Sequence, residues 1–473
     1  MSVEVLTFGC RLNAAESDAM RGLAERAGLR GAVLVNTCAV TAEAEKQARQ
    51  AIRAAHRRNP AAPILVTGCA AQIAPGAWAS LPGVARVVPN PDKLRPEAWS
   101  RGAAPAAAEP LRGPAPAFPP GDEPRPATLA APEPPMPPAP APPGDEPPPP
   151  AAPERHAPPA SPPPGETPRP AAERPVLSAS AQRTRAFVQV QGGCDHACTF
   201  CVIPQGRGPS FSVPLGPLAE RLRRLVEQGH REAVLTGVDI ASYGADLPGR
   251  PSLGAAVRRL LALVPELPRL RLSSLDPAAL DDELWRLLAE EPRFMPHLHL
   301  SLQHGADLVL KRMKRRHNRA DALRAARRAR QARPDVALGA DLIAGFPTET
   351  DAHHRETLDL AGEMGLAFLH VFPYSERPGT PAARMPPVPL PLRRERAARL
   401  RAFGAAAAAR FYGSRVGREE AVLFEADGRR GRTEHAAPLR LPDSAEPVPR
   451  GELRRVRVAS ADAHGLVAAM GAR

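Results

Sequence analysis

Three cysteines within eight residues constrain this chain more than any other feature of its sequence. Cys194, Cys198 and Cys201 have three and then two residues between them. A structural zinc site needs four protein ligands in a closed tetrahedron, so three thiolates leave such a site one ligand short. A [4Fe–4S] cluster is held by cysteine thiolates, and with three of them one iron stays open to bind another molecule. A zinc site completed by His196 or by a distant cysteine is the alternative.

The first hundred residues alternate β-type runs with helical patterns. The apolar runs lie at residues 3–8, 32–35 and 64–67, and the helical patterns between them lie at 13–27 and 41–58. Strands that alternate with helices predict a parallel sheet with right-handed crossovers. We expect Asn13 to cap the first helix, because an Asn side chain accepts from free amides, and Gly28 to end it, because glycine adopts the left-handed conformation found there.

A cysteine stands just past the end of each of these three strands. These residues are Cys10, Cys38 and Cys69. Parallel sheets bind ligands beyond the carboxyl ends of their strands, so we expect the three thiols to converge on one edge. They would form a second set of three cysteines without a fourth. Three buried free cysteines, each a small core residue, are the alternative.

Residues 104–182 differ abruptly in composition from the rest of the chain. About half of the 60 prolines lie there, mixed with Ala, Glu and Gly, and almost no aliphatic periodicity remains. Proline fixes φ and removes a hydrogen-bond donor, so neither helices nor sheets propagate through it. We predict a Pro-rich disordered linker, with an N-terminal domain at residues 1–103 before it. Docking of its Pro-Pro-x-Pro strings into a recognition module is the alternative.

Strand–helix alternation returns between residues 183 and 411. The six candidate strands lie at residues 186–190, 233–236, 270–273, 298–302, 337–343 and 368–372, with helical stretches such as 218–228 and 321–330 between them. Six units are too few for a closed eight-stranded barrel. The loop of Cys194 follows the first of these strands, at the carboxyl-end rim where barrels carry their active sites.

The carboxyl-terminal region and the charge of the chain both suit a nucleic-acid partner. Residues 412–473 contain short β-type runs divided by Gly and Asp, which predict a small β-barrel. The formal net charge of +13 favours a polyanionic partner, although Arg-rich coding bias is an equal explanation. A dense basic run at residues 311–319 is either a solvated face or a contact for RNA phosphates.

The cysteine count and the hydropathy limit the environment in which this protein works. Six cysteines in 473 residues do not make a disulfide framework. Residues 1–6 run straight into a strand pattern, so we expect no signal peptide. No window reaches the roughly 18 uninterrupted apolar residues of a membrane span. We therefore expect a cytoplasmic protein that makes no membrane contact.

The motif of Cys194, Cys198 and Cys201, with the aromatic Phe200 before its last cysteine, resembles the signature of the radical S-adenosylmethionine (SAM) superfamily. In that superfamily the open iron binds SAM, and reduction cleaves SAM to methionine and a 5′-deoxyadenosyl radical. The wider string at residues 192–208 resembles the methylthiotransferases, which insert a sulfur and a methyl group at an unactivated C–H bond. The resemblance extends to the strings around Cys10, Cys38 and Cys69, and it implies a second [4Fe–4S] cluster there that carries the transferred sulfur.

The resemblance also implies an architecture. The expected fold class is α/β, with an N-terminal parallel-sheet domain of flavodoxin or Rossmann type, an open (β/α)6 partial barrel at residues 183–411 and a TRAM-like β-barrel at residues 412–473. The linker at residues 104–182 departs from the family, which usually joins the first two domains more directly. Four residues at strand ends are expected to contact SAM, and no catalytic residue is expected beyond the cluster ligands. These contacts are Gly237, Val238, Gln303 and Gly345.

Two strings indicate a branch of the family. Residues 10–17 and 236–244 look most like the branch that modifies N6-threonylcarbamoyladenosine in tRNA at C2, next to the anticodon. SAM would serve there both as radical source and as methyl donor. Isopentenyladenosine in tRNA and a ribosomal-protein aspartate are alternative substrates, and a metal-stapled RNA-binding protein without catalysis is the alternative of another class. The expected partners are tRNA and an electron donor such as flavodoxin or ferredoxin, and we expect a monomer.

Overall fold

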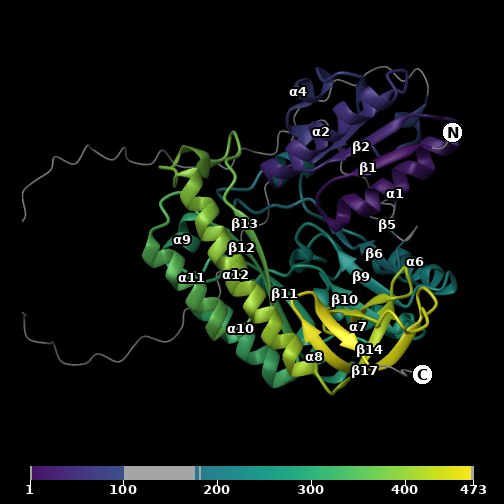
Figure 1. The fold of residues 1–473 in the computed structure, drawn as a ribbon. Coiled ribbons are helices and arrows are strands. Elements are labelled where there is room, and N and C mark those ends of the chain that lie inside the picture. The colour runs from purple at the N-terminus through teal and green to yellow at the C-terminus, as the bar shows by residue number, and fades with distance from the viewer. Residues whose placement is uncertain (1–2, 101–175, 180–182, 470–473) are drawn as a thin grey trace, which may run out of the picture. The chain divides into compact units, whose positions relative to one another are not determined.

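The computed structural model describes residues 3–100, 176–179 and 183–469. Figure 1 shows the regions that these residues form: an N-terminal sheet with its helices, a central array of parallel strands, and strands at the carboxyl end. The disorder predicted for residues 104–182 lies outside the described residues, apart from residues 176–179. Within these four, Ser178–Ala179 form the short strand β5.

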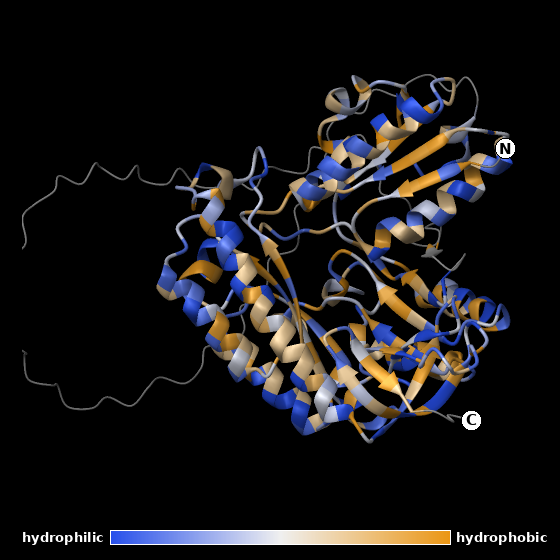
Figure 2. Ribbon diagram, in the orientation of Figure 1, coloured by the Kyte–Doolittle hydropathy of each residue, from blue (hydrophilic) through white to orange (hydrophobic). Residues whose placement is uncertain are grey.

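The N-terminal region is a four-stranded parallel sheet, as the alternation of strands and helices predicted. Its strands, in spatial order, are β1 (Glu4–Thr7), β2 (Val33–Thr37), β3 (Ile64–Gly68) and β4 (Val84–Val87). Helices α1 (Arg11–Arg26) and α2 (Ala42–Arg58) connect the first three strands. Every residue of β2 and β3 is buried, which is why both read as continuous apolar runs. These strands are mostly orange in Figure 2.

The prediction that Asn13 caps α1 is wrong. The helix begins at Arg11, so Cys10, which follows the left-handed Gly9, occupies the cap position and Asn13 lies in the first turn. There the Asn13 side-chain amide donates to the carbonyl oxygens of Phe8 at 2.7 Å and Thr37 at 3.1 Å. Asn13 therefore ties together the ends of two strands. The other end of α1 follows the prediction, because Gly28 stands just past the helix with a φ of 73°.

The central region contains the six predicted parallel strands. They are β6 (Arg185–Gln189), β9 (Glu232–Thr236), β10 (Arg269–Leu272), β11 (His297–Gln303), β12 (Ala337–Ala344) and β13 (Phe368–Pro373). Ladders join β6, β9 and β10 in one sheet and β11, β12 and β13 in another. Two isolated parallel bridges lie between these sheets, one from Leu270 of β10 to Phe294 and one from Leu275 to Leu300 of β11. No ladder among the described residues joins β13 back to β6, so the barrel is open as expected.

Helices cover the outer face of this partial barrel. They are α6 (Leu215–Glu227), α7 (Leu253–Leu263), α8 (Asp282–Glu290), α10 (Arg319–Ala332), α11 (Asp351–Glu363) and α12 (Leu390–Arg415). Alternate strand residues pack against them in the main hydrophobic core, for example Leu298, Leu300 and Leu302 of β11. Because side chains alternate along a strand, the intervening residues point to the inner face. None of the helices that the structure describes is long and apolar enough to cross a membrane.

The carboxyl-terminal strands close into the small β-barrel that the short β-type runs predicted. Their spatial order is β14 (Glu419–Phe424), β15 (Arg430–Thr433), β16 (Pro438–Arg440), β18 (Gly465–Ala468) and β17 (Leu453–Asp462). Val422, Phe424 and Val456 are buried in its core. The α/β class with a terminal β-barrel is thus confirmed.

The remaining elements are short and lie mostly near the cysteines. They are α3 (Cys69–Ile73), α4 (Pro75–Ala79), β7 (Gln191–Gly192), α5 (Ile203–Arg207), β8 (Phe211–Ser212) and α9 (Asp307–Arg312). Strands β7 and β8 pair with each other and close the loop that contains Cys194. Short 3-10 helices lie at Pro96–Trp99, Ile240–Ser242, Pro277–Ala279 and Pro381–Arg384.

Candidate functional site

The loop after β6 presents three thiols beyond the carboxyl end of the strand. The Cys194 amide donates to the Gly208 carbonyl oxygen at 3.1 Å, and the Cys201 amide donates to the Cys198 carbonyl oxygen at 3.1 Å. Gly193 has a φ of 66°, and a Cβ at this position would overlap the Pro209 carbonyl oxygen. Only glycine fits this approach, so the loop closes tightly around its cysteines.

Two of these thiols lie in surroundings that disfavour the charged thiolate. Burial, with a smaller contribution from the neighbouring cysteines, raises the pKa of Cys194 and of Cys201 to about 12. Without a metal these groups would therefore stay protonated at neutral pH. Arg315 Nη1 lies 3.7 Å from Cys198 Sγ, where it donates a hydrogen bond to the sulfur.

The structure brings Cys10, Cys38 and Cys69 together at the carboxyl edge of the N-terminal sheet. Burial raises the pKa of Cys38 to about 12, and the charges of Cys10 and Cys69 contribute to this rise. The Val40 amide donates to Cys38 Sγ at 3.4 Å. Gly9 has a φ of 93°, and a Cβ there would lie 2.5 Å from Cys38 Sγ, so the strand end approaches the thiol closely.

The two sets of thiols adjoin each other. The charge of Cys69 contributes to the raised pKa of Cys201, which is possible only at short range. Gly206, in helix α5 after the Cys194 loop, packs so closely on Cys69 that an added Cβ would lie 3.1 Å from the Cys69 Cβ. The Asn90 side-chain amide donates both to the Gly206 carbonyl oxygen and, at 3.9 Å, to Cys69 Sγ. One short segment therefore separates the two sites.

Three buried charged residues, Arg207, Glu16 and Lys93, meet at this junction, and no sequence motif predicts that they do. Arg207 donates to Glu16 Oε1 at 2.7 Å and to Asn13 Oδ1 at 2.6 Å, and Lys93 Nζ lies 2.7 Å from Glu16 Oε2. Burial raises the pKa of Glu16, but the charges of Arg207 and Lys93 outweigh it and lower that pKa to about 2. Two cations and one carboxylate leave one positive charge beside Cys69 and Cys10, where it favours thiolates or an anionic cluster.

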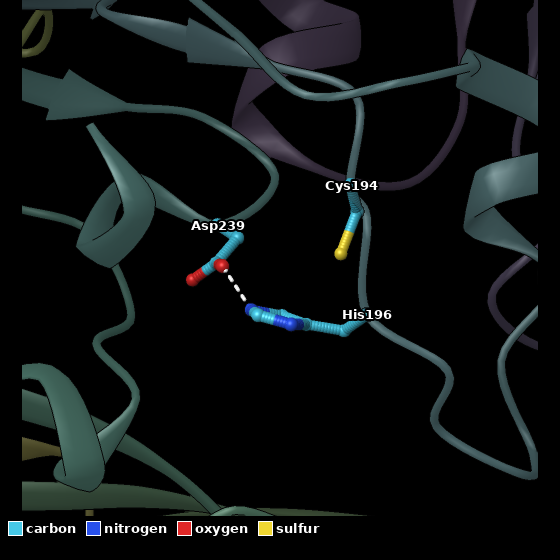
Figure 3. Close-up of side chains that lie close together, drawn as sticks. All are labelled: Cys194, His196 and Asp239. Atoms are coloured by element: carbon cyan, nitrogen blue, oxygen red, sulfur yellow. Dashed lines mark hydrogen bonds and ion pairs between the residues drawn. The ribbon is translucent and has the colours of Figure 1, made fainter. Parts of the chain in front are cut away.

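His196 lies beside Cys194 and Asp239. Figure 3 shows its ring directed at the Asp239 carboxylate, with the Cys194 sulfur facing the same space. His196 Nε2 lies 2.5 Å from Asp239 Oδ2, and the ligand atoms of His196, Asp239 and Cys194 all lie within 4.8 Å of one another.

A zinc ion held by His196 and three thiolates does not fit this geometry. Zinc–sulfur bonds of about 2.3 Å require ligand sulfurs within about 4.6 Å of one another. All six cysteines of the chain are described, and in neither set do all three sulfurs lie within 4.8 Å of one another. Each set therefore spans more space than a single tetrahedral ion fills.

The four residues expected to contact SAM all lie at the rim that carries the Cys194 loop. Gly237 and Val238 follow β9, Gln303 ends β11 and Gly345 follows β12. Gln191 ties the turn after β9 to the loop, since its Oε1 accepts from the Val238 amide at 3.0 Å and its Nε2 donates to the Gly193 carbonyl oxygen at 2.9 Å. The structure thus gathers these residues around the loop, and their contact with SAM stays a prediction.

The basic run at residues 311–319 is divided: Lys311, Lys314 and Arg316 are exposed, whereas two of its side chains turn into the protein. Arg315 and His317 are buried. Arg315 Nη2 donates to Asp276 Oδ2 at 3.1 Å and to the Ser301 carbonyl oxygen at 2.7 Å. Burial raises the pKa of Asp276, but His317 and the two neighbouring arginines outweigh it and hold the pKa well below its usual range. Both predictions for this run are therefore wrong for Arg315 and His317, because tertiary packing gives them partners inside the protein.

Comparison with known proteins identifies the family. Residues 188–361 match the radical SAM superfamily, and residues 2–88 match the family described as Uncharacterized protein family UPF0004. A protein of Rickettsia prowazekii, named threonylcarbamoyladenosine tRNA methylthiotransferase MtaB, is 41% identical over 438 residues, which cover 93% of this chain and 91% of the relative. The chain belongs to the radical SAM methylthiotransferase family. It is therefore an enzyme of a family that uses SAM and an iron–sulfur cluster.

Two further relatives of this methylthiotransferase differ in how much of the chain they match. The protein named MtaB in Thermotoga maritima is 31% identical and covers 90% of this chain and 86% of its own length. A protein of Cereibacter sphaeroides named tRNA-2-methylthio-N(6)-dimethylallyladenosine synthase is 40% identical over 286 residues, which cover 59% of this chain and 64% of the relative.

Proposed function

We propose that this methylthiotransferase adds a methylthio group at C2 of N6-threonylcarbamoyladenosine next to the anticodon of tRNA. The observation that carries this proposal is the extent of the similarity to proteins with that named activity. Two relatives named for threonylcarbamoyladenosine match nine-tenths of the chain, whereas the relative named for dimethylallyladenosine matches 59% of it. The strings at residues 10–17 and 236–244, which indicated the same branch, support this choice.

In this proposal the six cysteines hold two [4Fe–4S] clusters. Cys194, Cys198 and Cys201 hold the cluster that binds SAM, and Cys10, Cys38 and Cys69 hold the second. The donor set fits: each site offers three thiols, spread too widely for one zinc ion and supported by N–H donors to sulfur. The C2–H bond of adenine is not acidic enough for a catalytic base. When bound, the clusters and SAM supply three things: the radical that removes this hydrogen, the sulfur that is inserted, and the methyl group.

The contribution of the protein is to hold the two sites and the substrate in register. The segment at residues 203–208 joins the sites, because Gly206 packs on Cys69 and Arg207 is bonded to Glu16. Fixing reactants in one geometry removes much of the entropic barrier to a reaction between them. Gly206 and Gly208 of this segment are buried, which limits the access of water and other competing reactants there.

Contact with tRNA is assigned to the carboxyl-terminal β-barrel. Along β17, the exposed Arg455 and Arg457 alternate with the buried Val456 and Val458. Basic side chains on an exposed strand suit RNA phosphates, and the net charge of +13 agrees with such a partner. The proposal also includes an electron donor such as flavodoxin or ferredoxin. We expect the enzyme to act as a monomer in the cytoplasm.

Nucleoside analysis of tRNA tests the substrate. In a strain that lacks this protein, tRNA should lose 2-methylthio-N6-threonylcarbamoyladenosine and accumulate its precursor, while the methylthio derivative of isopentenyladenosine persists. Loss of the isopentenyladenosine product instead would assign the protein to the other branch. Unchanged tRNA together with a lost ribosomal-protein modification would favour the aspartate substrate.

A second experiment tests the cofactors. Anaerobic reconstitution should give about eight iron and eight sulfide per chain, four of each for every cubane cluster. About four of each, lost when the Cys194 loop is altered, would leave a single cluster and make Cys10, Cys38 and Cys69 structural. Zinc in place of iron would contradict the proposed chemistry.

A further inference from the structure

The inner face of the partial barrel is polar and charged. Its side chains come from alternate positions of the six strands, opposite the residues that pack in the main core. The charged and imidazole members are Arg185, Glu232, Arg269, Arg271, His297, His299, Asp341 and His370. A face of this kind suits a substrate with polar or charged groups, because an apolar group placed there would leave them unsatisfied.

Helix α1 of the N-terminal region lies against this inner face. Ala14 and Ala15 of α1 form one hydrophobic cluster with Phe187 of β6 and Val234 of β9. Arg11 is the first residue of the helix, directly after Cys10. Its guanidinium lies over the Phe187 ring, 5.7 Å from the ring centroid. The packing therefore places the Arg11 cation at the inner face of the barrel, next to the second set of thiols.

Arg11 has no acidic partner in the part of the chain that the structure describes. It forms no hydrogen bond or ion pair there, and its contact with Phe187 leaves its N–H groups free. The two carboxylates that act on it electrostatically are Glu232 and Asp341. Burial lowers the pKa of Arg11, and the nearby Arg271 lowers it further. Among the inner-face residues named above, Arg11 and three other arginines stand against only these two carboxylates.

Both of these carboxylates are bound by other groups. Glu232 Oε1 lies 3.1 Å from Arg271 Nε, and Glu232 Oε2 lies 3.7 Å from Arg269 Nη1. Asp341 Oδ1 lies 3.0 Å from His299 Nε2 and 3.3 Å from His370 Nδ1. A half-buried guanidinium whose neighbouring acids are occupied indicates a ligand that brings its own negative charge.

We propose that Arg11 binds the carboxylate of the threonyl group on N6 of the substrate adenosine and so determines the specificity of the enzyme. This inference rests on the proposed function. The threonylcarbamoyl substituent ends in a carboxylate, and a guanidinium presents paired N–H donors that match it. Since Arg11 follows Cys10 directly, a substituent bound there keeps its adenine beside the second set of thiols.

The same residue would exclude the competing substrate. An isopentenyl group carries no charge, so its entry would bury Arg11 without a partner. A site built to bond a polar group discriminates strongly against an analogue that lacks the group, because its own donors are left unpaired. Arg11 thus acts both by attracting the carboxylate and by penalising its absence.

The test compares two RNAs that differ only in this charge. Anticodon stem–loops would carry N6-threonylcarbamoyladenosine either with its free carboxylate or with the carboxylate converted to a primary amide. The ratio of kcat/KM for the two RNAs, measured with anaerobically reconstituted full-length enzyme, does not depend on how many molecules carry both clusters. Wild-type enzyme should prefer the carboxylate by at least about 10-fold, the effect expected of a charge-assisted hydrogen bond. In Arg11→Met the ratio should fall to about one, and Arg11→Lys should keep part of the preference.

Arg26→Met is the matched control, because Arg26 is an exposed arginine in the last turn of the same helix. It should keep the wild-type ratio. A wild-type ratio near one, or an Arg11→Met enzyme with the wild-type preference, would overturn the inference while leaving the proposed function intact. A wild-type ratio near one overturns the inference even if the Arg11 variants fail to load their clusters. A wild-type enzyme that does not methylthiolate the carboxylate RNA at all would overturn the proposed function and this inference together.

Discussion

Arg207 Nη1 lies 2.7 Å from Glu16 Oε1, and this contact joins helix α5 of the radical SAM region to helix α1 of the N-terminal region across 191 residues of sequence. Both side chains are buried. Arg207 comes six residues after Cys201, and Glu16 comes six residues after Cys10. One ion pair therefore links the segments that carry the two sets of cysteines.

Removing the Glu16 charge should destabilise the junction strongly. Glu16→Gln leaves Arg207 and Lys93 buried without an acid, and loss of one partner from a buried pair costs about 3–5 kcal/mol. The free energy of unfolding in urea should fall by about that amount, and the iron content should fall with it. Glu25→Gln, at an exposed position of the same helix, is the control and should stay within about 0.5 kcal/mol of wild type. A Glu16→Gln protein as stable as this control would show that the pair is not needed.

The two sets of cysteines should be separable by substitution. Cys198→Ala should abolish the production of 5′-deoxyadenosine from SAM under reducing conditions, because it removes a ligand of the SAM-binding cluster. Cys38→Ala should keep SAM cleavage but stop formation of the methylthio product. Each variant should retain about four of the eight iron atoms expected per chain. A Cys38→Ala enzyme that makes the methylthio product in full yield would disprove the two-cluster assignment.

The backbone of the Cys194 loop should not tolerate a side chain at Gly193. Gly193→Ala places a Cβ onto the Pro209 carbonyl oxygen at a positive φ, which should cost about 2 kcal/mol or more and distort the loop. Iron bound after reconstitution should drop from about eight to about four per chain. Gly216→Ala is the matched control, since a Cβ there meets nothing within 4 Å and the residue lies in helix α6. Full iron loading of Gly193→Ala would contradict the geometry of the loop.

Acid should destabilise the barrel through His297. Burial lowers the pKa of His297 well below its ordinary value, and Arg271 lowers it further, so the folded protein binds this proton less readily than the unfolded chain. The stabilising contribution is therefore present above pH 6.5 and lost as the pH falls below it. For one such group, the free energy of unfolding falls by about 1.4 kcal/mol when the pH is lowered from about 7.5 to about 5.5. Urea unfolding at both pH values gives the difference in the free energy of unfolding between them. This difference should be smaller by about 1.4 kcal/mol in His297→Gln and unchanged in His464→Gln, an exposed control. An unchanged pH dependence in His297→Gln would rule out this titration.

The strands were predictable because each is a short apolar run that ends at polar or glycine residues. The nine candidate strands of the first two folded regions all appear in the structure with small shifts of their ends. Strand β4, with a half-buried Val84–Val87, has too weak a pattern to be recognised. The prediction for Asn13 failed for a local reason. The cap of α1 is Cys10, three residues earlier, because the chain turns at Gly9, where the backbone passes close to Cys38.

The sequence by itself determined the order of strands and helices, the two sets of three cysteines and the glycines around them, because these depend on local spacing and conformation. Only the tertiary structure decided that Glu16 joins Arg207 and Lys93, that Arg315 donates to Cys198, and that Arg11 faces the inside of the barrel. These partners stand tens to hundreds of residues apart, and nothing periodic in the chain marks them. Their pairing is set by the packing of whole elements in space, and buried charges then bond to whichever opposite groups that packing brings within reach.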